Sequence, residues 1–150
     1  MAGRIEYAPF MNKIMSAEDA AALIHPGANI GFSGFTGSGC AAAVPVALAE
    51  RIKAAHAAGQ EFKIGMFTGA STVPELDGVL AEADGVSFRT PYQSDPHMRN
   101  NINAGKTLYS DIHLSHLSQQ MMAGFHGRLD FAVVEGIGIR LRTEVRTKEI

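Results

Sequence analysis

The sequence predicts an α/β fold, with an open, mostly parallel sheet that carries helices on both faces. Short apolar runs alternate along the chain with longer stretches of helical periodicity. Two of the apolar runs end in loops of glycine and hydroxyl residues, which is typical of a strand passing into a helix. Strands that alternate with helices pair in parallel, and the crossover helices cover the faces of the sheet. The length of 150 residues allows one domain of this kind.

Capping residues mark the ends of the expected helices. Ser16 is a suitable N-cap, and Pro26-Gly27 ends the helix that follows it. Pro45 lies near the start of the next helix, and Gly59 lies just past its end. Pro74 opens a third helix. The expected helices cover residues 16–24, 44–58, 74–83 and 113–123.

Apolar runs rich in β-branched and aromatic residues mark the strands. The expected strands cover residues 29–33, 62–67, 86–89 and 129–135, and the last of these is expected to be buried. Residues 90–105 have mixed polarity and two prolines, so we expect a loop with some helical turns.

Composition limits the classes of function. The formal net charge of -2 gives no electrostatic footprint for nucleic acid. No apolar run approaches the roughly 20 residues that a membrane span needs. The N-terminus has no apolar signal-peptide segment, and the single cysteine, Cys40, cannot form a disulfide within the chain. We therefore expect a cytoplasmic protein.

The stretch over residues 30–45 is a strand, a glycine-rich loop and the start of a helix. Gly34, Gly37 and Gly39 let backbone N–H groups come close to a ligand, and the helix start adds further donors. Such a loop can bind an anion, a phosphate or an oxyanion. Residues 37–42 also fit the G-x-G-x-x-A pattern of a dinucleotide-binding turn, but the second strand ends without the carboxylate that would hold a ribose. A tight packing turn is the structural alternative.

Other polar residues have a structural and a functional interpretation. Ser71 lies in the small-residue loop over residues 68–72 that follows the second strand, and it could donate to a carboxylate or carbonyl, or could cap the following helix. His113 and His116 have metal-ligand spacing but lack a third ligand, so no metal site is expected. Glu135 could be catalytic, although a hydrogen-bonding role is favoured, and Cys40 is interpreted as a small packing residue.

Several short strings of this sequence are uncommon combinations, so together they are specific. They include residues 34–39, 68–72, 76–78, 88–92 and 98–105. By these strings the sequence resembles the acetyl-CoA hydrolase/CoA-transferase family, and within it the succinyl-CoA:acetate CoA-transferase branch of the class I CoA-transferases. The resemblance extends from about Ile14 to Glu135.

The resemblance implies a mechanism and a set of partners. In this family a glutamate carboxylate attacks an acyl-CoA, and a glutamyl-CoA thioester forms. That glutamate belongs to a second α/β half, so no catalytic residue is expected in this chain and the chain alone should be inactive. Coenzyme A would be a substrate, with no permanently bound cofactor or metal. The expected partners are acyl-CoA, a small carboxylate and a C-terminal half in the same or a neighbouring polypeptide, with a homodimer at full length.

The resemblance also assigns roles to residues. Ser71 and Ser94 match family hydroxyls near the carboxylate pocket, where the family usually has threonine in place of Ser94. Gly34, Gly37 and Gly39 would line the cleft. Residues 1–135 are then the N-terminal domain, and residues 136–150 a divergent basic tail, which a shifted reading frame would explain. The alternatives are a small CoA- or phosphate-binding module, a subunit of a split CoA-transferase and, less favoured, a nicotinamide-dependent oxidoreductase fragment.

Overall fold

The computed structural model describes residues 5 and 7–139, without the side chain of Ser71. The chain divides into two compact units, one made from residues 1–15 and 136–150 and the other from residues 16–135. In the first unit, η2 is a 3₁₀ helix (Ala8–Lys13), and Ile5 forms a parallel bridge with Ile139. The predicted basic tail lies mostly outside the described residues, since residues 140–150 are not among them.

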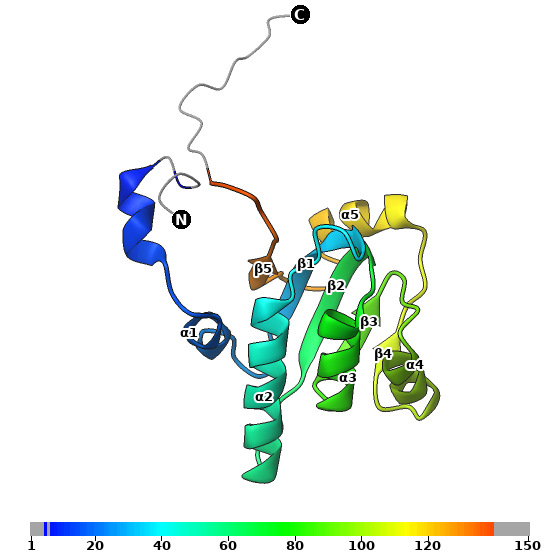
Figure 1. Cartoon of the computed structure of the whole chain (residues 1–150). Helices are drawn as coiled ribbons and strands as arrows, with labels where there is room; N and C mark the ends of the chain where they lie inside the picture. Colours follow the sequence, from blue (N-terminus) through cyan, green and yellow to red (C-terminus); the bar gives the residue numbers. More distant parts are fainter. Residues whose placement is uncertain (1–4, 6, 140–150) are drawn as a thin grey trace, which may run out of the picture. The chain divides into compact units, whose positions relative to one another are not determined.

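The second unit contains the sheet and its helices (Figure 1). Its elements are α1 (Ala17–Ala22), β1 (Asn29–Thr36), α2 (Ala43–Ala57), β2 (Ile64–Ser71), the π-helical turn η3 (Pro74–Gly78), α3 (Val79–Glu82), β3 (Val86–Thr90), α4 (Pro96–Asn103), β4 (Leu108–Tyr109), α5 (Leu114–Met122) and β5 (Phe131–Val133). The strand order is β4-β3-β2-β1-β5, and every strand pairs in parallel with its neighbours. The predicted fold class is confirmed. None of the helices among the described residues is long and apolar enough to cross a membrane.

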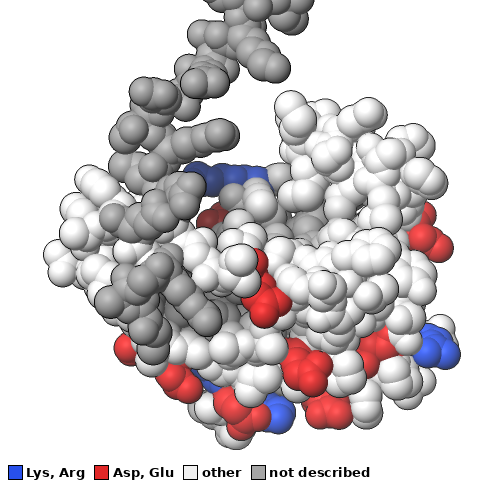
Figure 2. All heavy atoms as spheres, turned by 45° about the horizontal axis from the view of Figure 1, so that its top comes forward, with Lys and Arg blue, Asp and Glu red and all other residues white. Residues whose placement is uncertain are grey.

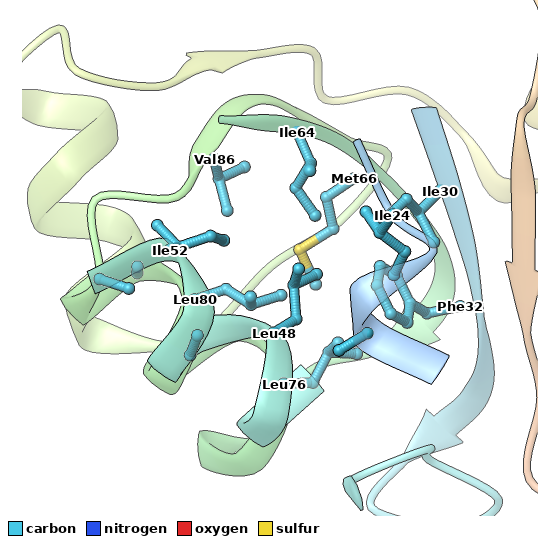
Figure 3. Packing of buried hydrophobic residues seen from close by; sticks show 14 of the residues in the cluster. Ile24, Ile30, Phe32, Leu48, Ile52, Ile64, Met66, Leu76, Leu80 and Val86 are labelled. Carbon is cyan, nitrogen blue, oxygen red and sulfur yellow. The ribbon is translucent and has the colours of Figure 1, made fainter. Parts of the chain in front are cut away.

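One face of the sheet packs against α1, α2, η3 and α3 and holds the main core (Figure 3). Because side chains alternate along a strand, every second residue of β1 and β2 points into this core. The residues of these two strands that point into the core are Ile30, Phe32, Ile64 and Met66. Leu48 and Ile52 of α2 pack against them, and all six side chains are essentially inaccessible to solvent.

The opposite face carries glycines and aromatic rings. Phe67, Phe88 and His126 form a cluster with ring centroids 5.6 Å apart in each pair. The side chain of Asn29 donates to the carbonyls of His126 and Arg128 at 3.3 and 3.0 Å, which holds the segment before β5 on this face. This segment and α5 cover the second face less completely than the helices cover the first.

Several predicted boundaries are wrong. β2 runs on to Ser71, so most of the small-residue loop expected over 68–72 is strand. The helical turns expected within the loop over 90–105 are present as a single helix, α4, whose N-cap Asp95 accepts from the N–H groups of His97 and Met98 at 2.8 and 3.0 Å. The predicted helix over 74–83 is a π-helical turn followed by one short α-helical turn.

The last strand differs from the prediction in length and burial. β5 has three residues in place of the seven expected, and Ala132 and Val134 are exposed. The physical reason is its place at the edge of the sheet, where one flank and part of one face remain open. The two-residue strand β4 was not predicted, because so short a pair has no recognisable pattern.

Candidate functional site

The glycine loop after β1 makes a tight turn at the carboxyl edge of the sheet. The Ser38 N–H donates to the Phe35 carbonyl at 3.0 Å, and the Phe35 N–H donates to the Ser38 carbonyl at 2.8 Å. Gly34 and Gly39 have φ values of 135° and 66°, which a residue with a Cβ rarely adopts. Thr36 has φ 50°, a strained conformation for a β-branched residue. Strain of this kind clusters at ligand-binding loops.

The loops that follow β1 and β2 lie side by side. Thr36 pairs with Ser71 at the ends of these parallel strands. A Cβ atom on Gly37 would lie 3.7 Å from Cγ1 of Val73 in the second loop. The Ser71 side chain is outside the described part of the structure. Its alternative role as a helix cap is wrong, because Val73 holds that position before η3.

The loop after β3 joins the same edge through a pair of hydroxyl groups. Oγ of Ser94 lies 3.3 Å from Oγ1 of Thr72, and the Ser94 N–H donates to the same Thr72 oxygen at 3.2 Å. The Arg99 guanidinium donates to the Ser94 carbonyl at 3.1 Å. Ser94 is exposed, so its hydroxyl is held beside the second loop and still accessible.

A buried ion pair supports the bases of the second and third loops. Nε of Arg89 donates to Oδ1 of Asp77 at 2.8 Å, and both side chains are inaccessible to solvent. Arg89 also donates to the Thr90 carbonyl at 2.8 Å, at the end of β3. Burial raises the pKa of Asp77, and the neighbouring Arg89 charge opposes this in part. The pair therefore ties η3, which follows the second loop, to the strand that leads into the third.

Ser33 connects the glycine loop to the end of β5. Its hydroxyl donates to the Gly39 carbonyl at 2.8 Å and accepts from the Glu135 N–H at 2.9 Å. Glu135 thus takes part through its backbone, and its side chain is exposed.

Sequence reasoning missed three features of this edge: Ser33, Thr72 and the Asp77–Arg89 pair. A serine next to a glycine is common in loops, so this pattern does not indicate a functional residue. The same is true of Thr72, which stands among other small loop residues. A buried ion pair has no sequence spacing of its own, so no local signal could have found it.

This edge of the sheet carries few charges of its own. Residues 29–49 and 64–74, which include the first two loops, contain no Asp, Glu, Lys or Arg. Figure 2 brings this end of the molecule forward: much of the described surface is uncharged, and acidic side chains gather toward the lower part of the view. Because β2 has no acidic residue, it offers no carboxylate for a ribose, which disfavours the nicotinamide alternative. Hydroxyl groups and backbone N–H groups of this edge are therefore its main hydrogen-bonding groups.

The remaining candidates have structural surroundings. The His113 ring accepts from the Ser115 N–H at 3.3 Å and caps α5. Among the described residues no group of three or more His, Cys, Asp or Glu side chains could hold a metal ion, so His113 and His116 have no third ligand there. Cys40 is buried and belongs to the core cluster.

Of the predicted site residues, the structure brings Gly34, Gly37 and Gly39 into one turn beside the end of β2, where Ser71 lies. Ser94 reaches the same edge through Thr72.

Comparison with known proteins assigns this arrangement to a family. Residues 2–140 match the acetyl-CoA hydrolase/transferase N-terminal domain. Propanoyl-CoA:succinate CoA transferase of Escherichia coli is 41% identical over 121 residues, which are 81% of this chain and 25% of that protein. Succinyl-CoA:acetate CoA-transferase of Clostridium kluyveri is 37% identical over 91% of this chain and 25% of its own length. Acetyl-CoA hydrolase of Saccharomyces cerevisiae is 33% identical over 91% of this chain and 27% of its own length.

The chain therefore spans about a quarter of the length of these relatives. The family match covers the whole sheet and all three loops of the edge. The chain belongs to the family of acetyl-CoA hydrolase/transferase N-terminal domains.

Proposed function

We propose that this chain forms one wall of the active site of an enzyme that moves CoA between acetyl-CoA or succinyl-CoA and a small carboxylate, or that hydrolyses acetyl-CoA. The observation that carries the proposal is the shared edge of three loops, with glycine backbone from one and hydroxyl groups from the others. Membership of the family supports it, because the relatives are named for these reactions.

The proposed reaction needs a nucleophile that this wall does not supply. A glutamate carboxylate from another part of the enzyme attacks the acyl-CoA carbonyl, which forms a mixed anhydride and releases the CoA thiolate. The thiolate attacks the glutamyl carbonyl of the anhydride, which gives a glutamyl-CoA thioester and frees the carboxylic acid. An acceptor acid reverses these steps, or water hydrolyses the thioester. Coenzyme A is a substrate here, and no resident cofactor is part of the scheme.

The loops would act on the carboxylate and on the oxyanions of this reaction. Ser94, with its hydroxyl held beside Thr72, would donate to the substrate carboxylate, and Ser71 is proposed for the same pocket. N–H groups of the turn over residues 34–39 would line the cleft near the reacting carbonyl. The scarcity of charge at the edge suits this role, because few charged side chains of the chain itself compete there for the hydrogen-bond donors.

The opposite wall would come from the region that follows this domain in the longer relatives. It could belong to the same polypeptide or to a neighbouring one, and we propose a cytoplasmic homodimer for the complete enzyme. This chain by itself should then give no CoA exchange when mixed with acetyl-CoA and succinate. Robust turnover by the purified chain would contradict the proposal that its nucleophile lies elsewhere.

A chimera tests the function directly. Residues 14–135 of this chain replace their counterpart in the E. coli relative, and CoA transfer from an acyl-CoA to succinate is measured. We expect a folded, active enzyme in which Ser94→Ala lowers kcat/KM by about tenfold to a hundredfold, the usual effect of losing a hydrogen bond to a charged group. Ser94→Thr is the matched control and should keep most of the activity, since it keeps the hydroxyl. A folded but inactive chimera, or equal losses in the two variants, would contradict the assigned role.

A further inference from the structure

A pair of hydroxyl groups joins the second and third loops, and the direction of the hydrogen bond between them matters. Ser94 donates its N–H to Oγ1 of Thr72 at 3.2 Å, and its own Oγ lies 3.3 Å from the same oxygen, where either hydroxyl group could be the donor. A hydroxyl oxygen accepts two hydrogen bonds and donates one. The proton between the two oxygens therefore decides which hydroxyl group is left to donate to a ligand.

The two arrangements differ in which proton has a partner. If Ser94 donates to Thr72, the Thr72 oxygen accepts twice, and its own proton has no acceptor within the described part of the chain. If Thr72 donates to Ser94, the half-buried hydroxyl group of Thr72 is fully bonded and the proton of Ser94 is free. Ser94 is the exposed member of the pair, so only the second arrangement presents a donor where a ligand can reach it.

The main chain on both sides of the pair holds this geometry. The Ser94 carbonyl accepts from the Arg99 guanidinium at 3.1 Å. In the second loop, the carbonyl of Val73, directly after Thr72, accepts from the Asp77 N–H at 2.9 Å. The side chain of Thr72 is β-branched and has few rotamers, so it loses little freedom when it makes the contact. The hydroxyl pair is therefore organised before a ligand binds.

We infer that Thr72 is a positioning residue for the carboxylate pocket, which donates to Oγ of Ser94 and so directs the Ser94 proton at the carboxylate of the substrate. This rests on the proposed function, in which Ser94 donates to that carboxylate. The Ser94 N–H, the two hydroxyl groups and the carboxylate form one chain of hydrogen bonds, in which each donor polarises the next and the last bond ends on a charged acceptor. Thr72 makes and breaks no covalent bond and acts only through Ser94.

The single-chain chimera with the E. coli relative tests this role. Thr72→Val keeps the shape of the side chain and removes its hydroxyl group. We expect it to lower kcat/KM for succinate by about threefold to tenfold, the usual effect of losing one neutral hydrogen bond. Thr72→Ser should restore most of the activity, because it returns the hydroxyl group. In a chimera that already carries Ser94→Ala, Thr72→Val should cause no further loss, since Thr72 acts through Ser94.

A second threonine provides the matched control. Thr90→Val removes a hydroxyl group that donates to the Ser110 carbonyl at 2.8 Å, a bond that does not involve Ser94. Its effect on kcat/KM should add to that of Ser94→Ala.

Nuclear magnetic resonance of the full chain tests the contact without an activity measurement. Thr72→Val should move the amide proton of Ser94 to a lower chemical shift, because that N–H loses its acceptor. Thr72→Ser should leave this resonance close to its position in the unmodified chain.

The outcomes separate this role from the function. An active chimera in which Thr72→Val causes no loss, or a loss that adds to that of Ser94→Ala, would overturn the role of Thr72 and leave the proposed function standing. Equal losses in Thr72→Val and Thr72→Ser, or an unchanged Ser94 amide resonance in Thr72→Val, would also overturn it. A folded chimera that is inactive with the unmodified sequence would contradict the proposed function, and the role of Thr72 would fall with it.

Discussion

The two faces of the sheet differ in how completely they are covered. On the face toward α2, side chains such as Leu48, Ile52 and Met66 are wholly buried. On the face toward α5, aromatic rings and glycines replace the aliphatic residues, and Leu114 and Val134 remain exposed. A face whose strands carry glycine gains little from its own side chains and depends on what packs against it. The comparison teaches that the first face holds the side chains that stabilise the fold, while the second leaves apolar side chains exposed.

The largest expected effect comes from breaking the buried ion pair on the first face. Arg89→Met leaves the Asp77 carboxylate buried without its partner, which typically costs about 3–5 kcal/mol of unfolding free energy. Urea denaturation of the variant and the unmodified chain measures the loss. Lys53→Met is the control, because the Lys53–Glu50 pair is exposed and such pairs contribute about 0–1 kcal/mol.

The same variant has a predicted pH dependence. Burial already raises the pKa of Asp77, and removing Arg89 raises that pKa further. When the pKa of a carboxyl is higher in the folded state than in the unfolded state, its contribution to the free energy of unfolding is fully present below the unfolded pKa of about 4. That contribution is lost as the pH rises. The loss of unfolding free energy in Arg89→Met, relative to the unmodified chain, should therefore shrink as the pH falls from 7 toward 4. A deficit that stays constant with pH would show that the loss arises from packing.

A pair of leucine truncations sharpens the comparison of the two faces. Leu48→Ala removes a wholly buried side chain and should cost about 2–5 kcal/mol. Leu114→Ala on α5 should cost less than about 1 kcal/mol, because that side chain is already half in solvent. Thermal and urea unfolding measure both. Similar losses in the two variants would mean that the second face is as well packed as the first.

A glycine substitution has a smaller expected effect than the two substitutions in the core of the first face, and it tests the second face alone. A Cβ at Gly65 would overlap Oδ1 of Asn29, whose side chain holds the carbonyls of His126 and Arg128. Gly65→Ala should therefore cost about 1–3 kcal/mol and loosen the segment before β5. Hydrogen exchange of residues 124–130 reports the loosening. Gly31→Ala is the matched control, because its Cβ would meet the movable end of Leu129, and it should leave that exchange nearly unchanged.

Much of the fold could be predicted from the sequence because its signals are local. Ser16 accepts from the Asp19 N–H as its N-cap, and the strand–helix alternation gives the parallel sheet. The helix α4 could also have been found, since Asp95 followed by Pro96 is a standard helix start. The exposure of β5 could not, because an apolar run has the same pattern at the edge of a sheet and at its centre.

The loops of the candidate site could be predicted from the sequence, but the side-chain contacts between these loops could not. The glycines at 34, 37 and 39 predict a turn, and parallel strands bring their carboxyl ends to one edge of the sheet. The contact of Thr72 with Ser94 joins residues 22 positions apart. No local pattern specifies that contact, or the burial of Arg89 against Asp77, because both depend on how three loops pack together.

One hydroxyl group lies between the turn and the edge of the sheet. Ser33 holds the carbonyl of Gly39 on one side and the backbone N–H of Glu135 on the other. Because one hydroxyl group binds both segments, a displacement of the turn and a displacement of the chain after β5 would each disturb the other. Removing this hydroxyl would deprive the Gly39 carbonyl and the Glu135 N–H of their shared partner.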